Sequence, residues 1–181
     1  MTARDPAGTD VGGGLLRRYC DAMRARVGER ADSAIGVVDA RMIARYARAI
    51  GATDPIHYDA DAARAAGFAD VVAPPNMITA VVDWGAGAPE SELGPDGTAA
   101  GTAVPGLRIM GAGDDVRVLR PLVAGTDLVE ERVVAEVTLR HGRSGPSAFV
   151  TFAHTFRTPA GEVLTENRRT IVVRPLPEDR R

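Results

Sequence analysis

The sequence predicts a two-layer α+β domain in which one antiparallel β-sheet packs against a buried helix. In the last third of the chain, β-branched and partly alternating runs are separated by turns that contain Gly or Pro. These runs predict strands over residues 116–122, 126–140, 148–157 and 162–174. Residues 77–84 follow two prolines and an asparagine and are apolar nearly all round, which is typical of a helix in the protein interior. The connections between the strands are short, so we expect an antiparallel meander.

The N-terminal segment is predicted to give one helix and one strand. Residues 1–14 are rich in Gly and Asp and are expected to be disordered. Apolar residues at helical spacing predict a helix over residues 15–27, which Gly28 ends. Residues 33–38 form a short apolar run that predicts the first strand.

Two further helices are predicted before residue 70. Asp39 has the character of an N-cap, and the helix that follows should end at Gly51. A short Ala-rich helix is expected next, capped by Asp59 or Asp61 and stopping at Gly67.

The remaining segments complete a single predicted domain over residues 15–174. Residues 85–106 are rich in Gly, Pro and acids and are too long for a plain connection, which predicts a surface lid. Residues 128–139 are long for one strand, so that strand should twist strongly or carry a bulge. The charged tail over residues 175–181 is expected to be frayed.

The composition favours a soluble cytoplasmic protein. The chain has 181 residues, a net charge of −2 and 45% hydrophobic residues, without the basic excess that nucleic-acid binding would require. It contains no apolar run of membrane-spanning length and no signal-peptide pattern at its start. Cys20 is the single cysteine and cannot form an internal disulfide, which fits a reducing compartment. We expect its thiol to be inert.

Polar, apolar and titratable groups converge on the segment that follows Gly51. Asp54-Pro-Ile-His57 predicts a tight turn, in which Pro55 is suited to the first position of a new helical turn. Asp54 and His57 are three residues apart, so their side chains can share one face. Ala73-Pro-Pro75-Asn76 then leads into the predicted buried helix.

Seven short motifs, taken together over residues 30–174, resemble the MaoC family of (R)-specific enoyl-thioester hydratases and dehydratases. They are Tyr46-Ala-x-Ala-x-Gly51, Asp54-Pro-Ile-His57-x-Asp59, Gly67-Phe68, Ala73-Pro-Pro75, Leu119-Arg-Pro121, Gly125-Thr126 and Gly161-Glu162. The resemblance implies the hotdog fold, in which an antiparallel β-sheet wraps around a central buried α-helix.

The sequence departs from the fully catalytic members of this family at one important position. Those members read Gly-Asp-x-Asn-Pro-x-His, so the general-base aspartate maps onto Ala52 and the asparagine onto Asp54. The catalytic histidine maps onto His57. Ala73-Pro-Pro75 stands where active members have His-Gly-Met, and it resembles the N-terminal, tunnel-type subgroup, whose members often pair with a second hotdog subunit.

The resemblance implies a set of site residues for hydration or dehydration of an acyl thioester. His57 would transfer protons and Asp54 would be its partner, while N–H groups of Asn76, Met77 or Ile78 would stabilise an oxyanion. The acyl chain would lie along the buried helix. Its predicted contacts are Met77, Val81 and Trp84. Arg108, with Arg117 and Arg120, would hold the phosphates of CoA or a carrier-bound pantetheine.

Each of these residues also has a purely structural interpretation. Asp54 could simply cap the turn that begins at Pro55, and His57 could be a packed or solvated residue at a helix start. The arginines could be scattered surface residues. His154 shares a strand face with two phenylalanines, where a satisfied structural role is favoured over ligand binding, and His141 is expected in an exposed turn.

Three functions remain open from the sequence. The first is a hydratase or dehydratase that works as a dimer or larger assembly on an acyl-CoA or acyl-carrier-protein substrate. The second is a non-catalytic subunit that shapes the acyl tunnel of a heteromeric enzyme. The third is another hotdog chemistry, such as a thioesterase or a tailoring dehydratase or isomerase, for which Asp83 would be the acidic residue of the buried helix. We expect no cofactor and no metal, because the three histidines lack short ligand spacing.

Overall fold

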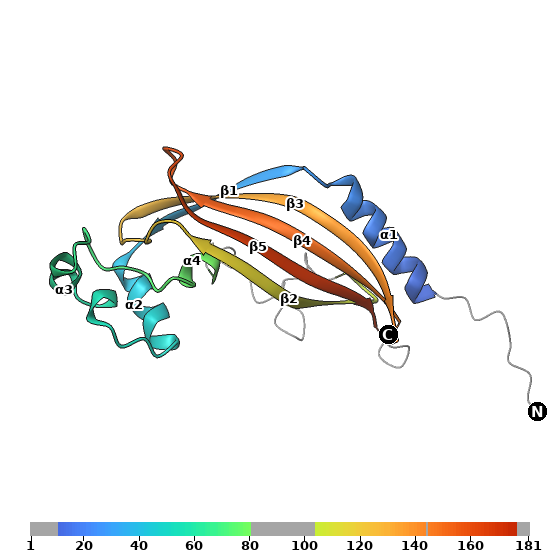
Figure 1. The fold of residues 1–181 in the computed structure, drawn as a ribbon, viewed down its shortest axis with the longest axis horizontal. Helices are drawn as coiled ribbons and strands as arrows, with labels where there is room; N and C mark the ends of the chain where they lie inside the picture. Colours follow the sequence, from blue (N-terminus) through green and yellow to red (C-terminus); the bar gives the residue numbers. More distant parts are fainter. Residues whose placement is uncertain (1–10, 81–103, 144, 177–181) are drawn as a thin grey trace, which may run out of the picture.

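The computed structural model describes residues 11–80, 104–143 and 145–176 (Figure 1). The helices are α1 (Val11–Ala25), α2 (Ala40–Ala49), the 3₁₀ turn η1 (Pro55–His57), α3 (Ala60–Ala65) and α4 (Met77–Ala80). The strands are β1 (Arg30–Val38), β2 (Leu107–Val118), β3 (Thr126–Gly142), β4 (Gly145–Arg157) and β5 (Val163–Pro175). No helix within these ranges is both long and apolar enough to cross a membrane.

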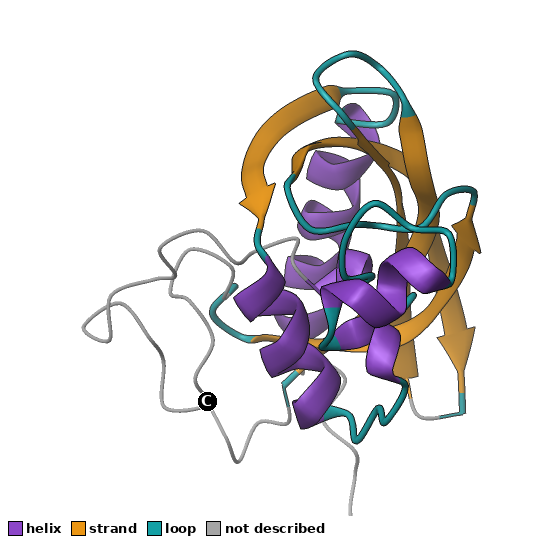
Figure 2. Ribbon diagram, turned by 90° about the vertical axis from the view of Figure 1, so that its left-hand side faces the viewer, coloured by secondary structure: helices purple, strands orange, loops and turns teal. Residues whose placement is uncertain are grey.

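The described strands form one antiparallel sheet in the order β1-β3-β4-β5-β2. The strands curve around the helices (Figure 2). This arrangement confirms the predicted α+β class and the hotdog fold. The meander over β3, β4 and β5 is confirmed as well, and the sheet is completed by β1 beside β3 and β2 beside β5.

Strand β2 begins at Leu107, nine residues before the start that the sequence predicted. The alternation is hidden there because the pairing with β5 shifts between Gly111 and Gly113. Strand β3 has 17 residues and a register shift between Val134 and Glu136, which confirms the bulge expected for a strand of this length.

The helix ends follow the predicted capping chemistry. The Asp39 side chain accepts a hydrogen bond from the Met42 N–H and caps α2, and Asp59, rather than Asp61, caps α3. Helix α1 begins at Val11, inside the segment that we expected to be disordered, so that prediction was wrong for residues 11–14. Because Gly12 and Gly13 are buried, burial rather than sequence propensity accounts for this early start.

Two groups of apolar side chains occupy opposite ends of one face of the sheet, which we call the inner face. The α4 cluster contains Met77, Ile78 and Phe156 together with residues of α2, β1 and β3. At the other end, Leu16 and Cys20 of α1 pack against Ala148 and other residues of β2, β4 and β5. Figure 1 shows α1 along one end of the sheet, with α2 and α3 at the other. Burial raises the pKa of the Cys20 thiol, which fits the inert role predicted for it.

Part of the predicted central helix and most of the predicted lid cannot be compared with the structure. Helix α4 confirms the helix start after the two prolines, and Met77 and Ile78 are buried as expected. Val81, Asp83 and Trp84 lie outside the described residues, as does most of the predicted lid over residues 85–106.

Candidate active site

The turn that carries His57 is built by local sequence signals. Helix α2 ends at Gly51, whose φ of 70° is a conformation that favours glycine. The Asp54 side chain then accepts a hydrogen bond from the Ile56 N–H at 3.1 Å, with Pro55 in the first turn of η1. The carboxyl group is exposed and acts as an N-cap, which is the structural role that we weighed for it.

The His57 ring is held by a backbone carbonyl group. Its Nδ1 lies 2.6 Å from the carbonyl oxygen of Val72, and the Ile56 carbonyl in turn accepts a hydrogen bond from the Val72 N–H at 3.0 Å. A carbonyl oxygen only accepts, so Nδ1 carries the proton of this hydrogen bond. In the neutral ring, Nε2 is therefore the unprotonated nitrogen and can accept a proton.

The segment around Val72 is itself anchored to the chain before β3. The Ala73 N–H donates to the Leu122 carbonyl at 2.8 Å, and the Ala124 N–H donates to the Val71 carbonyl at 3.0 Å. These two bonds fix the carbonyl that orients His57 relative to the sheet. The position of the imidazole thus depends on contacts between segments about 50 residues apart in sequence.

Ala52, onto which the resemblance maps the general-base aspartate, lies in a tightly held part of the same loop. Its N–H donates to the Ala47 carbonyl at 2.9 Å, and its carbonyl oxygen accepts a hydrogen bond from the Tyr58 hydroxyl. The Tyr58 ring is also covered by the Arg48 guanidinium, 5.6 Å from the ring centroid. The backbone of the loop is therefore well fixed although the carboxylate is missing.

His57 borders a largely apolar cavity of about 420 Å³. The lining residues come from η1, the segment before α4 and α4 itself, the end of β2 and the segment after it, and strand β5. They are Ile56, His57, Phe68, Val72, Ala73, Pro74, Pro75, Ile78, Val118, Leu119, Arg120, Pro121, Leu122 and Thr165. The cavity therefore combines one titratable imidazole, one guanidinium and one buried hydroxyl with apolar walls, as small-molecule sites commonly do.

The other predicted site residues take varied positions. Asn76 is exposed, and its backbone carbonyl accepts a hydrogen bond from the Thr79 hydroxyl at 3.0 Å. Met77 is buried in the α4 cluster and does not line the cavity, and its N–H donates to the Pro74 carbonyl at 2.9 Å. That hydrogen bond removes Met77 from the three N–H groups expected to stabilise an oxyanion. Val81 and Trp84 lie outside the described residues.

The three predicted phosphate-binding arginines do not gather at one point. Arg108 lies at the start of β2, opposite Arg174 and away from the cavity. Arg117 lies near the other end of the strand, where it is 3.8 Å from Glu166. Arg120 is the one that lines the cavity, and its Nε forms an ion pair with Glu162 at 2.9 Å.

Sequence reasoning missed a second polar group on the inner face of the sheet. His154 Nδ1 lies 2.5 Å from Glu130 Oε1, and both side chains are 4% exposed. Asn167 is buried on the neighbouring strand. The alternation of Phe152, His154 and Phe156 indicated which face His154 occupies, but Glu130 carried no sequence signal because it is 24 residues away.

The family model for the FAS1-like dehydratase domain region matches residues 25–167. The chain belongs to this family. The UPF0336 protein of Parafrankia sp. (strain EAN1pec) is 33% identical over 136 residues, which are 73% of this chain and 80% of the relative. The probable enoyl-CoA hydratase alpha subunit of Thermomonospora curvata is 31% identical over 145 residues, or 76% of this chain, and the match spans only 46% of that longer relative.

Solved structures, a MaoC-like dehydratase among them, share the fold. The MaoC-like dehydratase from Rhodospirillum rubrum superposes with a TM-score of 0.59 at 27% identity, covering 83% of this chain and 94% of that one. A chain of the ChsH1-ChsH2 complex from Mycobacterium tuberculosis gives a TM-score of 0.68 at 21% identity, covering 92% and 96%. The family resemblance read from the sequence is therefore confirmed, and this FAS1-like dehydratase region adopts the hotdog fold.

Proposed function

We propose that this chain adds or removes water at the 2,3 position of an acyl thioester bound to CoA or to a carrier protein, with His57 as the acid–base residue. The observation that supports this most directly is the hydrogen bond between His57 Nδ1 and the Val72 carbonyl. It assigns the proton to Nδ1 and leaves Nε2 as the nitrogen able to take a proton, in a residue that lines an acyl-sized cavity.

The remaining groups of the cavity have complementary roles in this proposal. The apolar walls would bury the acyl chain, and Arg120 would attract the phosphates of CoA or pantetheine at the rim. Asp54 would act by holding the turn that carries His57, since its carboxylate is bonded to the Ile56 N–H. Its predicted direct partnership with the ring, and the predicted contacts of Asn76, Met77, Val81, Trp84 and Arg108, stay predictions.

A second candidate is a subunit that shapes the acyl tunnel while a partner hotdog chain supplies the missing carboxylate. Ala52 at the aspartate position favours it, since an imidazole alone lacks the second group that would activate water. Two findings on relatives add support. One similar structure is a complex of two named subunits, and one relative is described as an alpha subunit. In either case we expect a cytoplasmic homodimer or heterodimer.

Hydration of crotonyl-CoA by the purified chain tests the first candidate. We expect measurable turnover that His57→Ala abolishes. Turnover should rise when Ala52→Asp supplies the missing carboxylate. Turnover that His57→Ala leaves unchanged would contradict the acid–base role. Activity that appears only after a second hotdog subunit is added would favour the tunnel-subunit candidate instead.

Product analysis distinguishes the first two candidates from the third, which is another hotdog chemistry such as a thioesterase. Incubation with enoyl, 3-hydroxyacyl and saturated acyl thioesters should give interconversion of the first two and no free CoA. Release of free CoA from the saturated thioester would indicate a thioesterase and would overturn the proposal.

A further inference from the structure

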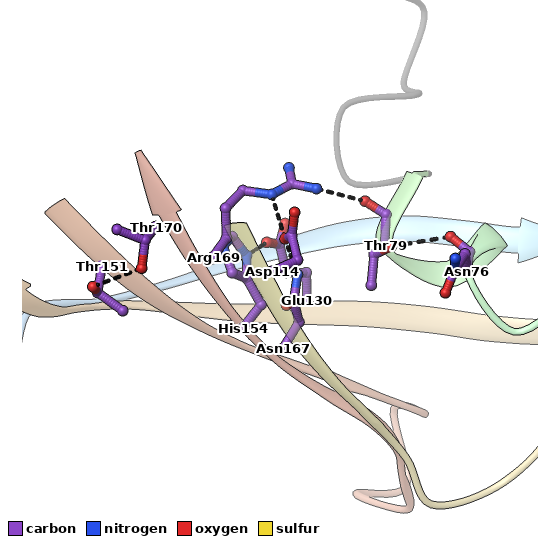
Figure 3. A network of polar contacts seen from close by, with 9 residues as sticks. All are labelled: Asn76, Thr79, Asp114, Glu130, Thr151, His154, Asn167, Arg169 and Thr170. Atoms are coloured by element: carbon purple, nitrogen blue, oxygen red, sulfur yellow. Dashed lines mark hydrogen bonds and ion pairs between the residues drawn. The ribbon is translucent and has the colours of Figure 1, made fainter. Parts of the chain in front are cut away.

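A row of polar side chains crosses the inner face of the sheet between its two apolar ends (Figure 3). Alternate residues of β4 point to this face. Phe156 belongs to the α4 cluster and Val150 packs near α1, and the polar His154 lies between them. The row comprises Asp114, Glu130, His154, Asn167 and Arg169. Glu130, His154 and Asn167 are buried, and buried polar groups are costly unless each one is paired.

The His154 ring is fixed from one side. Its Nδ1 is 2.5 Å from Glu130 Oε1, and the ring stacks on Phe156 with centroids 6.3 Å apart and an interplanar angle of 7°. Phe152 lies on the other side at 6.2 Å. The carboxylate thus orients the ring through Nδ1, and Nε2 has no hydrogen-bond partner among the described residues.

The Asn167 side chain is fixed in the same manner. Its Nδ2 donates to Asp114 Oδ1 at 3.0 Å, and Arg169 Nε donates to the same oxygen at 2.9 Å. Burial acts to raise the pKa of Asp114, but these hydrogen bonds and the nearby positive charge outweigh it and lower the pKa below its ordinary value. An ionised carboxylate only accepts, so the amide must present its NH₂ group to Asp114. Asn167 Oδ1 then points away from Asp114, and within the described part of the chain it has no partner.

These two unpaired atoms belong to residues that face each other. His154 and Asn167 are opposite one another in the β4–β5 pairing, so their side chains leave the same face about 5 Å apart at Cβ. His154 is 5% exposed and Asn167 1%. The two unpaired atoms thus belong to buried side chains that are neighbours on the inner face.

The cavity beside His57 comes within two residues of this pair along β5, although neither His154 nor Asn167 lines it. Thr165 lines the cavity and faces the same way as Asn167, two residues further along β5. Two residues of a strand span roughly 7 Å. A chain that lies in the cavity over Thr165 and extends by that length reaches His154 and Asn167.

We propose that His154 Nε2 and Asn167 Oδ1 form a polar subsite that binds a hydroxyl group on the acyl chain, beyond the reacting carbons. This inference rests on the proposed function, because it assumes that the cavity holds an acyl thioester. The chain would thus select acyl thioesters that carry a distal hydroxyl over unsubstituted ones of equal length.

A hydroxyl group suits the pair in either protonation state of His154. With Nε2 protonated, the hydroxyl oxygen accepts from Nε2 and its hydrogen is donated to Asn167 Oδ1. With Nε2 unprotonated, the hydroxyl donates to one of the two acceptors. A ketone cannot donate to Asn167 Oδ1, and a methylene pairs with neither atom.

Calorimetric titration with saturated thioesters, which cannot be hydrated, isolates binding from turnover. The probes are decanoyl-CoA and hydroxydecanoyl-CoA isomers with the hydroxyl moved stepwise from C5 to C10. We expect at least one isomer to bind about tenfold more tightly than decanoyl-CoA. Asn167→Leu should remove that preference. Thr170→Val, on the opposite face where Thr170 pairs with Thr151 at 3.0 Å, should keep it.

A second variant tests the same preference in case Asn167→Leu does not fold. His154→Phe with Glu130→Leu removes both members of the buried pair together, so that no charge is left alone. It should also abolish the hydroxyl preference while decanoyl-CoA still binds.

The outcomes separate this proposal from the function on which it rests. Equal binding of decanoyl-CoA and every hydroxy isomer overturns the subsite and leaves the proposed function standing. A preference that survives in both variants also overturns the subsite. Absence of binding by all the thioesters overturns both proposals.

Discussion

His57 and His154 are held by different kinds of partner. His57 belongs to a turn, is half-buried and hydrogen-bonds a backbone carbonyl. His154 lies in the middle of β4, is almost completely buried and hydrogen-bonds a carboxylate. In both residues Nδ1 is the ring nitrogen that is hydrogen-bonded, but one ring borders a cavity and the other is buried on the sheet.

The difference predicts different consequences for substitution at the two histidines. A carbonyl partner orients the His57 ring without placing a charge beside it, so the ring is free to exchange protons through Nε2. Glu130 beside His154 brings a second ionisable group into the interior, where the two must be kept or removed together. We therefore expect substitutions at the two histidines to affect different properties.

The largest expected effect is on turnover at His57. His57→Ala should lower kcat/KM for crotonyl-CoA by about 10³-fold, the middle of the range for a lost acid–base group. Its unfolding free energy should fall by no more than about 1 kcal/mol, the value of one hydrogen bond. His141→Ala, an exposed histidine, is the matched control and should change neither quantity. Equal losses of turnover in the His57 and His141 variants would contradict the acid–base role of His57.

Next in size is the loss of stability when the buried pair is broken. Glu130→Leu should lower the unfolding free energy by about 3 kcal/mol, because it leaves His154 buried without its partner. Adding His154→Phe should recover much of this loss, since both polar groups are then absent. Urea unfolding of the single and double variants measures the coupling. Strictly additive losses would show that the two side chains are independent.

A smaller effect is expected at Asp54. Asp54→Ala should cost about 1 kcal/mol through the lost cap, whereas Asp54→Asn should keep most of the stability. Asp39→Ala, which removes the equivalent cap of α2, provides the comparison for stability. If Asp54 only holds the turn, Asp54→Asn also keeps its turnover. A large loss of turnover in the asparagine variant would restore the carboxylate to a direct role beside His57.

The smallest expected effect is a pH dependence at Asp114. Its pKa is lowered in the folded state, so its ionised form contributes stability that is fully present above the ordinary value of roughly 4. This contribution is lost as the pH falls through the lower, folded-state pKa. The difference in unfolding free energy between the native chain and Asp114→Asn should therefore shrink between pH 6 and pH 2.5. A difference that grows on acidification would contradict the assignment.

Local patterns predicted most of the helices and strands, and the capped turn that carries His57. The caps at Asp39 and Asp59, the start of α4 after Pro75, and strands β3 to β5 each depend on neighbouring residues, so the sequence shows them directly. The long start of β2 was missed because its glycines and acids conceal the alternation. The early start of α1 was missed because burial, not propensity, stabilises it.

The sequence by itself determined that this chain is an α+β domain with a histidine on a capped turn, because turns, caps and alternation act over a few residues. The tertiary structure decided which groups surround that histidine. Val72 reaches His57 across 15 residues, and Glu130 and Asn167 reach His154 through strand register. A one-residue shift of register would move these side chains to the other face, and no local pattern specifies the register.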